Sequence, residues 1–101
     1  MLQLRPNCEQ CNKTLAPDSD EAMMCSYECT YCRDCVKRLH NVCPNCGGGF
    51  VERPIRPTND YIEGVSLKHQ PASTKNIHKM VDLDEHAKFA ASIRNISPDK
   101  R

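Results

Sequence analysis

Eight cysteines are the residues in this 101-residue chain whose type and spacing could do chemistry. They follow the pattern C-x2-C-x13-C-x3-C-x2-C-x2-C-x7-C-x2-C, and no cysteine occurs after residue 46. Thiolate sulfur binds Zn²⁺ and iron, and a C-x2-C turn can point both of its sulfurs at one ion. The eight are Cys8, Cys11, Cys25, Cys29, Cys32, Cys35, Cys43 and Cys46. The pattern predicts two closed sites of four sulfurs each, and closed sites stabilise a fold rather than activate water.

Length and composition favour metal ions over disulfides as the stabilising element. A domain of roughly 50 residues buries too little surface to fold without a metal or disulfides. The first eight residues lack the basic and apolar regions of a secretory signal, and no segment approaches the ~20 apolar residues of a membrane span. We therefore expect a cytoplasmic protein, where thiols stay reduced. Secretion by another route would instead imply four disulfides.

Two structural Zn²⁺ ions are the expected cofactors, with iron as the alternative. The Cys43-Pro-Asn-Cys46-Gly knuckle is similar to that of rubredoxin, which holds iron. A rubredoxin-like centre would use only four of the eight cysteines. The chain also has no Trp and only two Phe, whereas such a centre is expected to have an aromatic core.

The cysteines must be positioned by short elements. Residues 22–25 have the composition of a strand, and Phe50 with Val51 suggests another that closes the domain. Val36 and Leu39 are spaced for one face of a helix from Asp34 to about Asn41. The expected fold is a small metal-stabilised α+β domain over residues 1–53, with a short hairpin and one short helix.

The second half of the chain contains no cysteine and is not predicted to belong to this domain. Pro54 and Pro57 mark the exit from the domain, and residues 58–81 show no clean hydrophobic period. We expect an extended or flexible connector over 54–81, a short amphipathic helix over 82–97 and a tail at 98–101. Asp82 is a suitable N-cap, with Glu85 placed to complete a capping box. The expected apolar face of this helix contains Leu83, Ala87, Ala90 and Ile93, widened by Phe89 and Ile96.

The order of the cysteine pairs, with Cys-Pro-x-Cys last, resembles the RING cross-brace. That resemblance implies that the first and third pairs share one ion and that the second and fourth share the other. The implied ligands are Cys8, Cys11, Cys32 and Cys35 at site 1, and Cys25, Cys29, Cys43 and Cys46 at site 2. A sequential pairing is the alternative, although it would crowd two sites where Cys29 and Cys32 are separated by only two residues. The stretch from Arg5-Pro-Asn-Cys8 to Arg53-Pro-Ile-Arg-Pro57 also resembles a family of short bacterial proteins of unknown function, and the likeness extends to His69-Gln-Pro-Ala-Ser-Thr74.

The function that these features favour is a structural zinc module that acts as a protein-interaction scaffold, with a partner that the sequence does not identify. The function of a ubiquitin-ligase RING is a less favoured hypothesis. Its partner docks on an apolar residue in the first pair, and a basic residue commonly follows the last cysteine; this chain has Gln10 and Gly47 in those places. Pro44 alone matches that docking pattern.

Nucleic-acid binding through a basic connector is the alternative function. Phosphate contacts would come from Arg53, Arg56, Lys68, Lys75 and Lys79, with stacking from Tyr27, Tyr31 or Tyr61. The chain carries 14 Lys and Arg against 13 Asp and Glu, so it lacks the strongly basic balance of most nucleic-acid-binding domains.

An enzyme or thiol redox protein is not expected, because no cysteine is left over from the two sites and no catalytic constellation stands out. His40 has the spacing of a zinc-knuckle ligand, but four-sulfur sites leave it no vacancy. His69, His78 and His86 are expected to be exposed polar residues.

Overall fold

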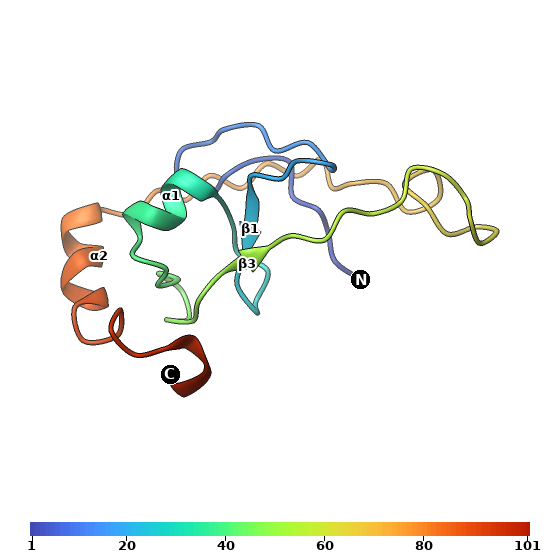
Figure 1. Ribbon diagram of the computed structural model, residues 1–101. Helices are drawn as coiled ribbons and strands as arrows, with labels where there is room; N and C mark the ends of the chain where they lie inside the picture. Colours follow the sequence, from blue (N-terminus) through green and yellow to red (C-terminus); the bar gives the residue numbers. More distant parts are fainter.

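Three short antiparallel strands form the sheet of the first half of the chain (Figure 1). The computed structural model describes residues 1–101. The strands are β1 (Ala22–Met24), β2 (Thr30–Cys32) and β3 (Val51–Glu52), in the order β2-β1-β3. Together with two α-helices they make the small α+β fold that the sequence predicts.

Helix α1 (Arg33–Arg38) begins directly after β2. It ends earlier than the predicted Asn41, because His40 and Asn41 both adopt left-handed backbone angles, with φ of 54° and 55°. The bend lets Asn41 Oδ1 accept a hydrogen bond from the backbone nitrogen of Phe50 at 2.9 Å. Val36 and Leu39 are buried, as the spacing predicts.

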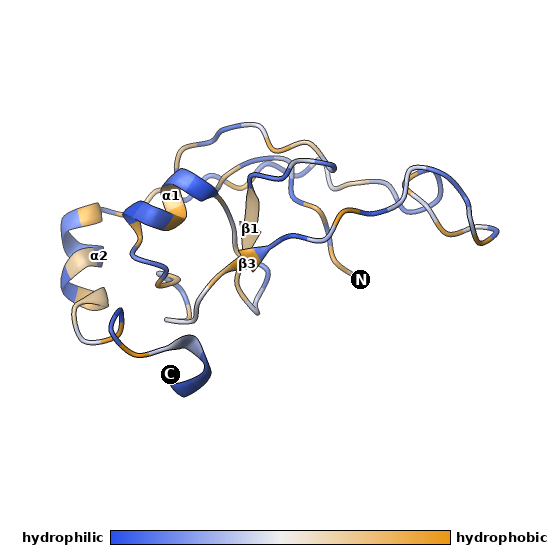
Figure 2. Ribbon diagram, in the orientation of Figure 1, coloured by the Kyte–Doolittle hydropathy of each residue, from blue (hydrophilic) through white to orange (hydrophobic).

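The hydrophobic core is small and rich in sulfur. Six of the twelve residues in its main cluster are cysteines. Tyr31 and Phe50 supply its aromatic contact, with ring centroids 5.3 Å apart in an edge-to-face arrangement. Hydrophobic residues are otherwise thinly spread along the chain (Figure 2). A core that consists half of cysteine side chains requires a metal or cross-links to hold it together.

The connector lies against the N-terminal segment. Residues 73–81 run beside residues 3–10 in the same direction. The backbone nitrogen of Ser73 bonds Gln3 O, and that of Lys79 bonds Glu9 O, both at 2.9 Å. The Gln10 side chain completes the contact, since its amide oxygen accepts from Val81 N at 2.8 Å and its amide nitrogen donates to Val81 O at 3.0 Å.

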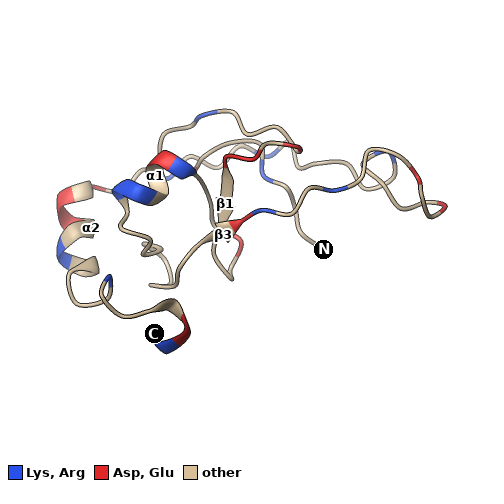
Figure 3. Cartoon of the chain, in the orientation of Figure 1, with Lys and Arg blue, Asp and Glu red and all other residues tan.

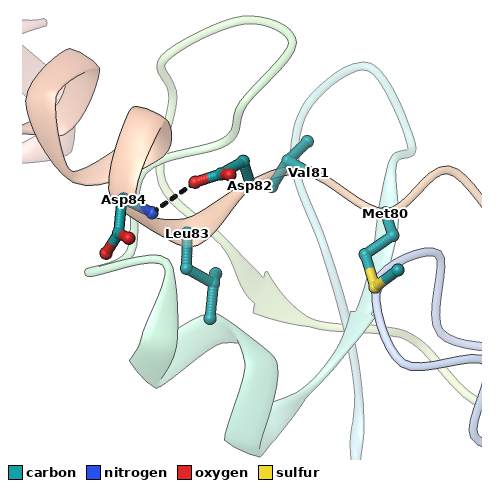
Figure 4. A pocket seen from close by; sticks show the side chains of 5 residues that line it. All are labelled: Met80, Val81, Asp82, Leu83 and Asp84. Carbon is teal, nitrogen blue, oxygen red and sulfur yellow. Dashed lines mark hydrogen bonds between the residues drawn. The ribbon is translucent and has the colours of Figure 1, made fainter.

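Helix α2 (Leu83–Ala90) follows this contact. Asp82 is its N-cap, with the carboxylate accepting from Asp84 N at 2.9 Å and from Glu85 N at 3.1 Å (Figure 4). The reciprocal half of the predicted capping box is absent, because the Glu85 side chain pairs with Lys88 instead.

Within α2, the packed face matches the predicted one only at Ala90. His86 and Ala90 are buried, whereas Ala87 is exposed. The helix also stops at Ala90, where the backbone nitrogens of Ile93 and Arg94 both bond Ala90 O and turn the chain. A 3₁₀ turn, η1 (Pro98–Lys100), follows beside Gly49. No helix is long and apolar enough to cross a membrane.

Candidate metal centres

Four sulfurs meet at the junction of the N-terminal knuckle, β2 and α1. The Sγ atoms of Cys8, Cys11, Cys32 and Cys35 all lie within 4.8 Å of one another. Cys11 and Cys32 Sγ are 3.8 Å apart. A tetrahedral site with Zn–S bonds of about 2.3 Å has sulfur–sulfur edges of about 3.8 Å, so this spacing fits a metal ion.

Local backbone geometry accounts for this first group. Asn12 adopts a φ of 64° immediately after Cys11, and its backbone nitrogen bonds Cys8 O at 2.9 Å. The tight turn brings both sulfurs of the pair to the same side. Cys32 is the last residue of β2, and Cys35 lies in the first turn of α1. The strand–helix junction therefore presents the partner pair as one rigid unit.

A second group forms between the hairpin and the last knuckle. It contains Cys25, Cys43 and Cys46, again with the sulfurs within 4.8 Å of one another. The turn from Cys43 to Gly47 is closed by a hydrogen bond from Gly47 N to Cys43 O at 2.8 Å, and Gly47 has a φ of 75°. Glycine suits this left-handed position because it has no Cβ.

Cys29 lies beside the second group rather than within it. Its sulfur accepts a hydrogen bond from Asn45 Nδ2 at 3.4 Å. The hairpin turn holds it close to Cys25, since Cys25 N bonds Cys29 O at 3.2 Å and Glu28 takes a φ of 68° in between. The structure thus assembles seven of the eight predicted ligands into two groups and leaves the eighth next to the second group.

Several N–H groups point at the sulfurs. Backbone nitrogens of Asn45 and Gly48 lie 3.4 Å from Cys43 and Cys46 Sγ, respectively. At the first group, the Arg38 guanidinium lies 3.8 Å from Cys35 Sγ. Such donors stabilise thiolate charge, and the first group has a cation for this purpose.

Burial acts against thiolate formation in the absence of metal. It raises the pKa of Cys32, Cys35, Cys29 and Cys43 above the ordinary value of a thiol. Cys11 is the exception. Burial raises its pKa, but hydrogen bonds with the Lys13 backbone and with neighbouring sulfurs outweigh burial, so the net pKa is lowered. A metal ion entering either group must therefore displace protons.

The two groups interleave along the chain. The first and third cysteine pairs meet, and the last pair meets Cys25 of the second pair. This is the connectivity of a cross-brace, and it differs from a sequential pairing. All eight cysteines are free of disulfides. Two clusters that can hold metal ions are thus present, in a chain whose cysteine pattern suggests a zinc-binding module.

Two polar residues that the sequence suggested would be accessible are buried. His86, expected to be exposed, is 4% exposed and its Nε2 lies 2.8 Å from Val42 O. Arg53, expected in a basic connector, is 2% exposed and donates to Arg5 O at 2.8 Å and Ala16 O at 3.1 Å. For His86, the one sequence feature that could have indicated burial is its position one helical turn before the apolar Ala90.

The surface hollows are lined by few residues that could take part in catalysis. The largest, of about 510 Å³, is lined by the five residues from Met80 to Asp84 (Figure 4). Its two carboxylates are those of Asp82 and Asp84, and Asp82 is occupied as the helix cap. A smaller hollow of about 350 Å³ lies between Tyr27, Asn45 and Cys46 at the second group.

Comparisons with known proteins agree with the cysteine pattern. Residues 1–56 match the family described as "Protein of unknown function (DUF1272)". The chain is 50% identical over 80 residues to an uncharacterized protein of Rhizobium meliloti (strain 1021), an alignment that covers 78% of this chain and 88% of that protein. No solved structure matches the chain significantly.

Proposed function

The chain belongs to the family described as "Protein of unknown function (DUF1272)", and from that premise we propose that it is a structural zinc protein whose metal-built fold serves as a scaffold for protein interaction. The observation that carries the metal assignment is the four-sulfur group of Cys8, Cys11, Cys32 and Cys35. Four thiolates close the coordination shell of a tetrahedral ion. No position remains for water or substrate, so the ion stabilises the fold.

The proposed second ion is bound by Cys25, Cys43 and Cys46, with Cys29 as the fourth ligand. Cys29 is the nearest remaining thiol, and its hydrogen bond from Asn45 holds its sulfur beside the group. Rotation of the Cys29 side chain would complete the shell. We assign zinc rather than iron because a rubredoxin-like iron centre would use only four of the eight cysteines, and the chain has no Trp and only two Phe to build the aromatic core expected around such a centre. Eight free thiols also fit a reducing cytoplasm.

Protein interaction is proposed because the chain exposes large apolar side chains at many places. Eleven such residues are at least 40% exposed, among them Tyr61 at 80% and Ile62 at 68%. A small domain held by metal ions can present such groups at fixed positions without a large core.

Ubiquitin-ligase activity and nucleic-acid binding are less well supported by the side-chain contacts in the structure. A ligase-type partner would have to contact Gln10, which is 6% exposed and bonded to Val81. A nucleic acid would need free cations in the connector. Arg53 and Arg56 instead donate to backbone carbonyls, which leaves Lys68, Lys75 and Lys79 as the connector cations without an ion pair. Basic and acidic residues are interspersed along the chain and form no concentrated basic face (Figure 3).

Native mass spectrometry combined with elemental analysis tests the metal assignment. We expect two zinc ions per chain, and we expect a chelator that removes them to abolish the folded circular-dichroism spectrum. Iron in place of zinc, a single ion, or a fold that survives removal of both ions would contradict the proposal. A matched sample under oxidising conditions would show whether disulfides can replace the ions.

A further inference from the structure

Residues 57–70 form a closed loop that projects from the metal-binding half of the molecule (Figure 1). Its ends are joined by a hydrogen bond from Leu67 N to Pro57 O at 2.8 Å. Inside the loop, Gln70 Nε2 donates to Gly64 O at 3.0 Å, and Ser66 is fully buried. The loop is therefore internally bonded rather than an unstructured linker. We call residues 54–70 the extension.

The outer part of the extension exposes apolar side chains. Tyr61 is 80% exposed, Ile62 68% and Val65 51%. With Met1 and Ile55 at the base, five of the eleven exposed large apolar residues lie at this end of the molecule. A concentration of this kind on a small protein marks an interaction surface.

The base of the extension carries an apolar hollow. Its volume is about 280 Å³, and its lining is Met1, Leu2, Leu4, Pro54, Ile55 and Arg56. The Arg56 guanidinium links the two ends of the extension to the N-terminal segment, because it donates to the carbonyl oxygens of Gln70 and Leu2. Each copy of the chain thus has an apolar tip and, at the base of the same extension, an apolar hollow.

The charges of the extension are also complementary between its two ends, because acidic residues lie at the tip and basic residues lie toward the base. Asp60 and Glu63 flank the apolar tip, whereas Arg56 and Lys68 lie where the loop closes. Neither Glu63 nor Lys68 has an ion-pair partner within the chain; Asp60 pairs with His69. Under a two-fold axis, an antiparallel pair of extensions places each tip on the base of the other copy, apolar on apolar and acid on base. An anionic membrane would instead be repelled by the acidic tip.

We propose that the extension is the interface of a homodimer, in which Tyr61, Ile62 and Val65 of one copy cover the basal hollow of the other. This inference deepens the proposed scaffold function and rests on it, since the partner that it names is a second copy of this chain. Its geometry uses the tip and the hollow reciprocally, as an isologous interface requires.

Sedimentation velocity of the zinc-loaded full chain, from low micromolar to submillimolar concentration, tests the dimer. We expect a concentration-dependent dimer that Ile62→Glu weakens by about tenfold or more, because it would bury an unpaired charge. Val51→Glu is the matched control, since Val51 is a β-branched residue with 66% exposure outside the extension. It should leave the dimer unchanged.

Charge reversal separates a direct contact from a folding effect. Glu63→Lys and Lys68→Glu should each weaken the dimer, and the double variant should restore part of the loss. A wild-type chain that stays monomeric at every concentration overturns the dimer, as does a dimer that survives Ile62→Glu. Zinc content is measured on the same samples. Two ions in a monomer would leave the metal assignment standing, whereas a protein without zinc would refute the proposed function itself.

Discussion

His86 Nε2 lies 2.8 Å from the carbonyl oxygen of Val42, the residue immediately before Cys43. A carbonyl oxygen only accepts, so Nε2 is the donor, and the buried Nδ1 has no partner. This bond joins α2 to the knuckle that carries the second sulfur group. His86 is therefore one of the contacts by which the second half of the chain supports the metal-binding half, in addition to the hydrogen bonds between Gln10 and Val81.

Replacing His86 by Ala should weaken this support. The change removes the donor to Val42 O and leaves a space in the packed face of α2. We expect the zinc-bound protein to lose about 1–3 kcal/mol of unfolding free energy. Amide exchange at Gly47, whose nitrogen bonds Cys43 O, should become faster. Denaturant titration and hydrogen exchange measure the two effects.

His69→Ala is the matched control for that variant. His69 is exposed and pairs only with Asp60, so its removal should cost less than about 1 kcal/mol. Equal effects of the two substitutions would show that the contact of His86 with Val42 has no special role.

Cys29→Ser tests whether the thiol beside the second group is a metal ligand. We expect the variant to lose one of two zinc ions and to unfold around the hairpin turn, because metal binding and folding are coupled. Asn45→Ala, which removes the donor to Cys29 Sγ but no sulfur, should keep both ions. Metal counting by native mass spectrometry distinguishes them. Two ions in Cys29→Ser would remove Cys29 from the ligand set.

Arg38→Gln should weaken the first site. The guanidinium lies 3.8 Å from Cys35 Sγ and would offset the negative charge of four thiolates around the proposed Zn²⁺. Loss of such an outer contact typically lowers metal affinity by about 10- to 100-fold. Lys37→Gln, one residue away and without a contact to sulfur, is the control. Zinc transfer to a chromogenic chelator reports both, and equal rates would argue against an electrostatic role for Arg38.

Arg53→Met tests the buried guanidinium. The substitution keeps most of the apolar volume but leaves the carbonyl oxygens of Arg5 and Ala16 without their donor. We expect a loss of about 2–3 kcal/mol in unfolding free energy, with the zinc content unchanged. Arg94→Met, at an exposed position, should have almost no effect. A stable Arg53→Met protein would mean that water replaces both hydrogen bonds.

Zinc retention should depend on pH with a definite sign. Burial raises the pKa of Cys35 and Cys43, so the protonated thiols are favoured in the metal-free fold. Zinc binding expels those protons, and its affinity should rise by up to about tenfold per pH unit for each proton released. Competition with a chelator of known affinity between mildly acidic and neutral pH measures the slope. A flat profile would contradict ligation by these thiols.

The amino-acid sequence alone predicts the pairs of metal-binding sulfurs and the tight turns that hold them. Eight cysteines at these spacings predict two sulfur sites whatever the rest of the fold, because a C-x2-C turn brings its two sulfurs together over a few residues. Val36 and Leu39 likewise predicted the buried face of α1. The predicted end of that helix, near Asn41, is three residues too late, because His40 and Asn41 take left-handed backbone angles and the hydrophobic spacing alone does not show this.

The way in which distant segments meet could be seen only in the folded structure. The grouping of Cys8 with Cys35, the burial of His86 against Val42 and the enclosure of Arg53 all depend on contacts between residues far apart in the chain. A histidine or arginine has the same local sequence signal whether its partner is water or a carbonyl oxygen from another segment. Burial and hydrogen bonding are set by which segments pack together, and local periodicity does not contain that information.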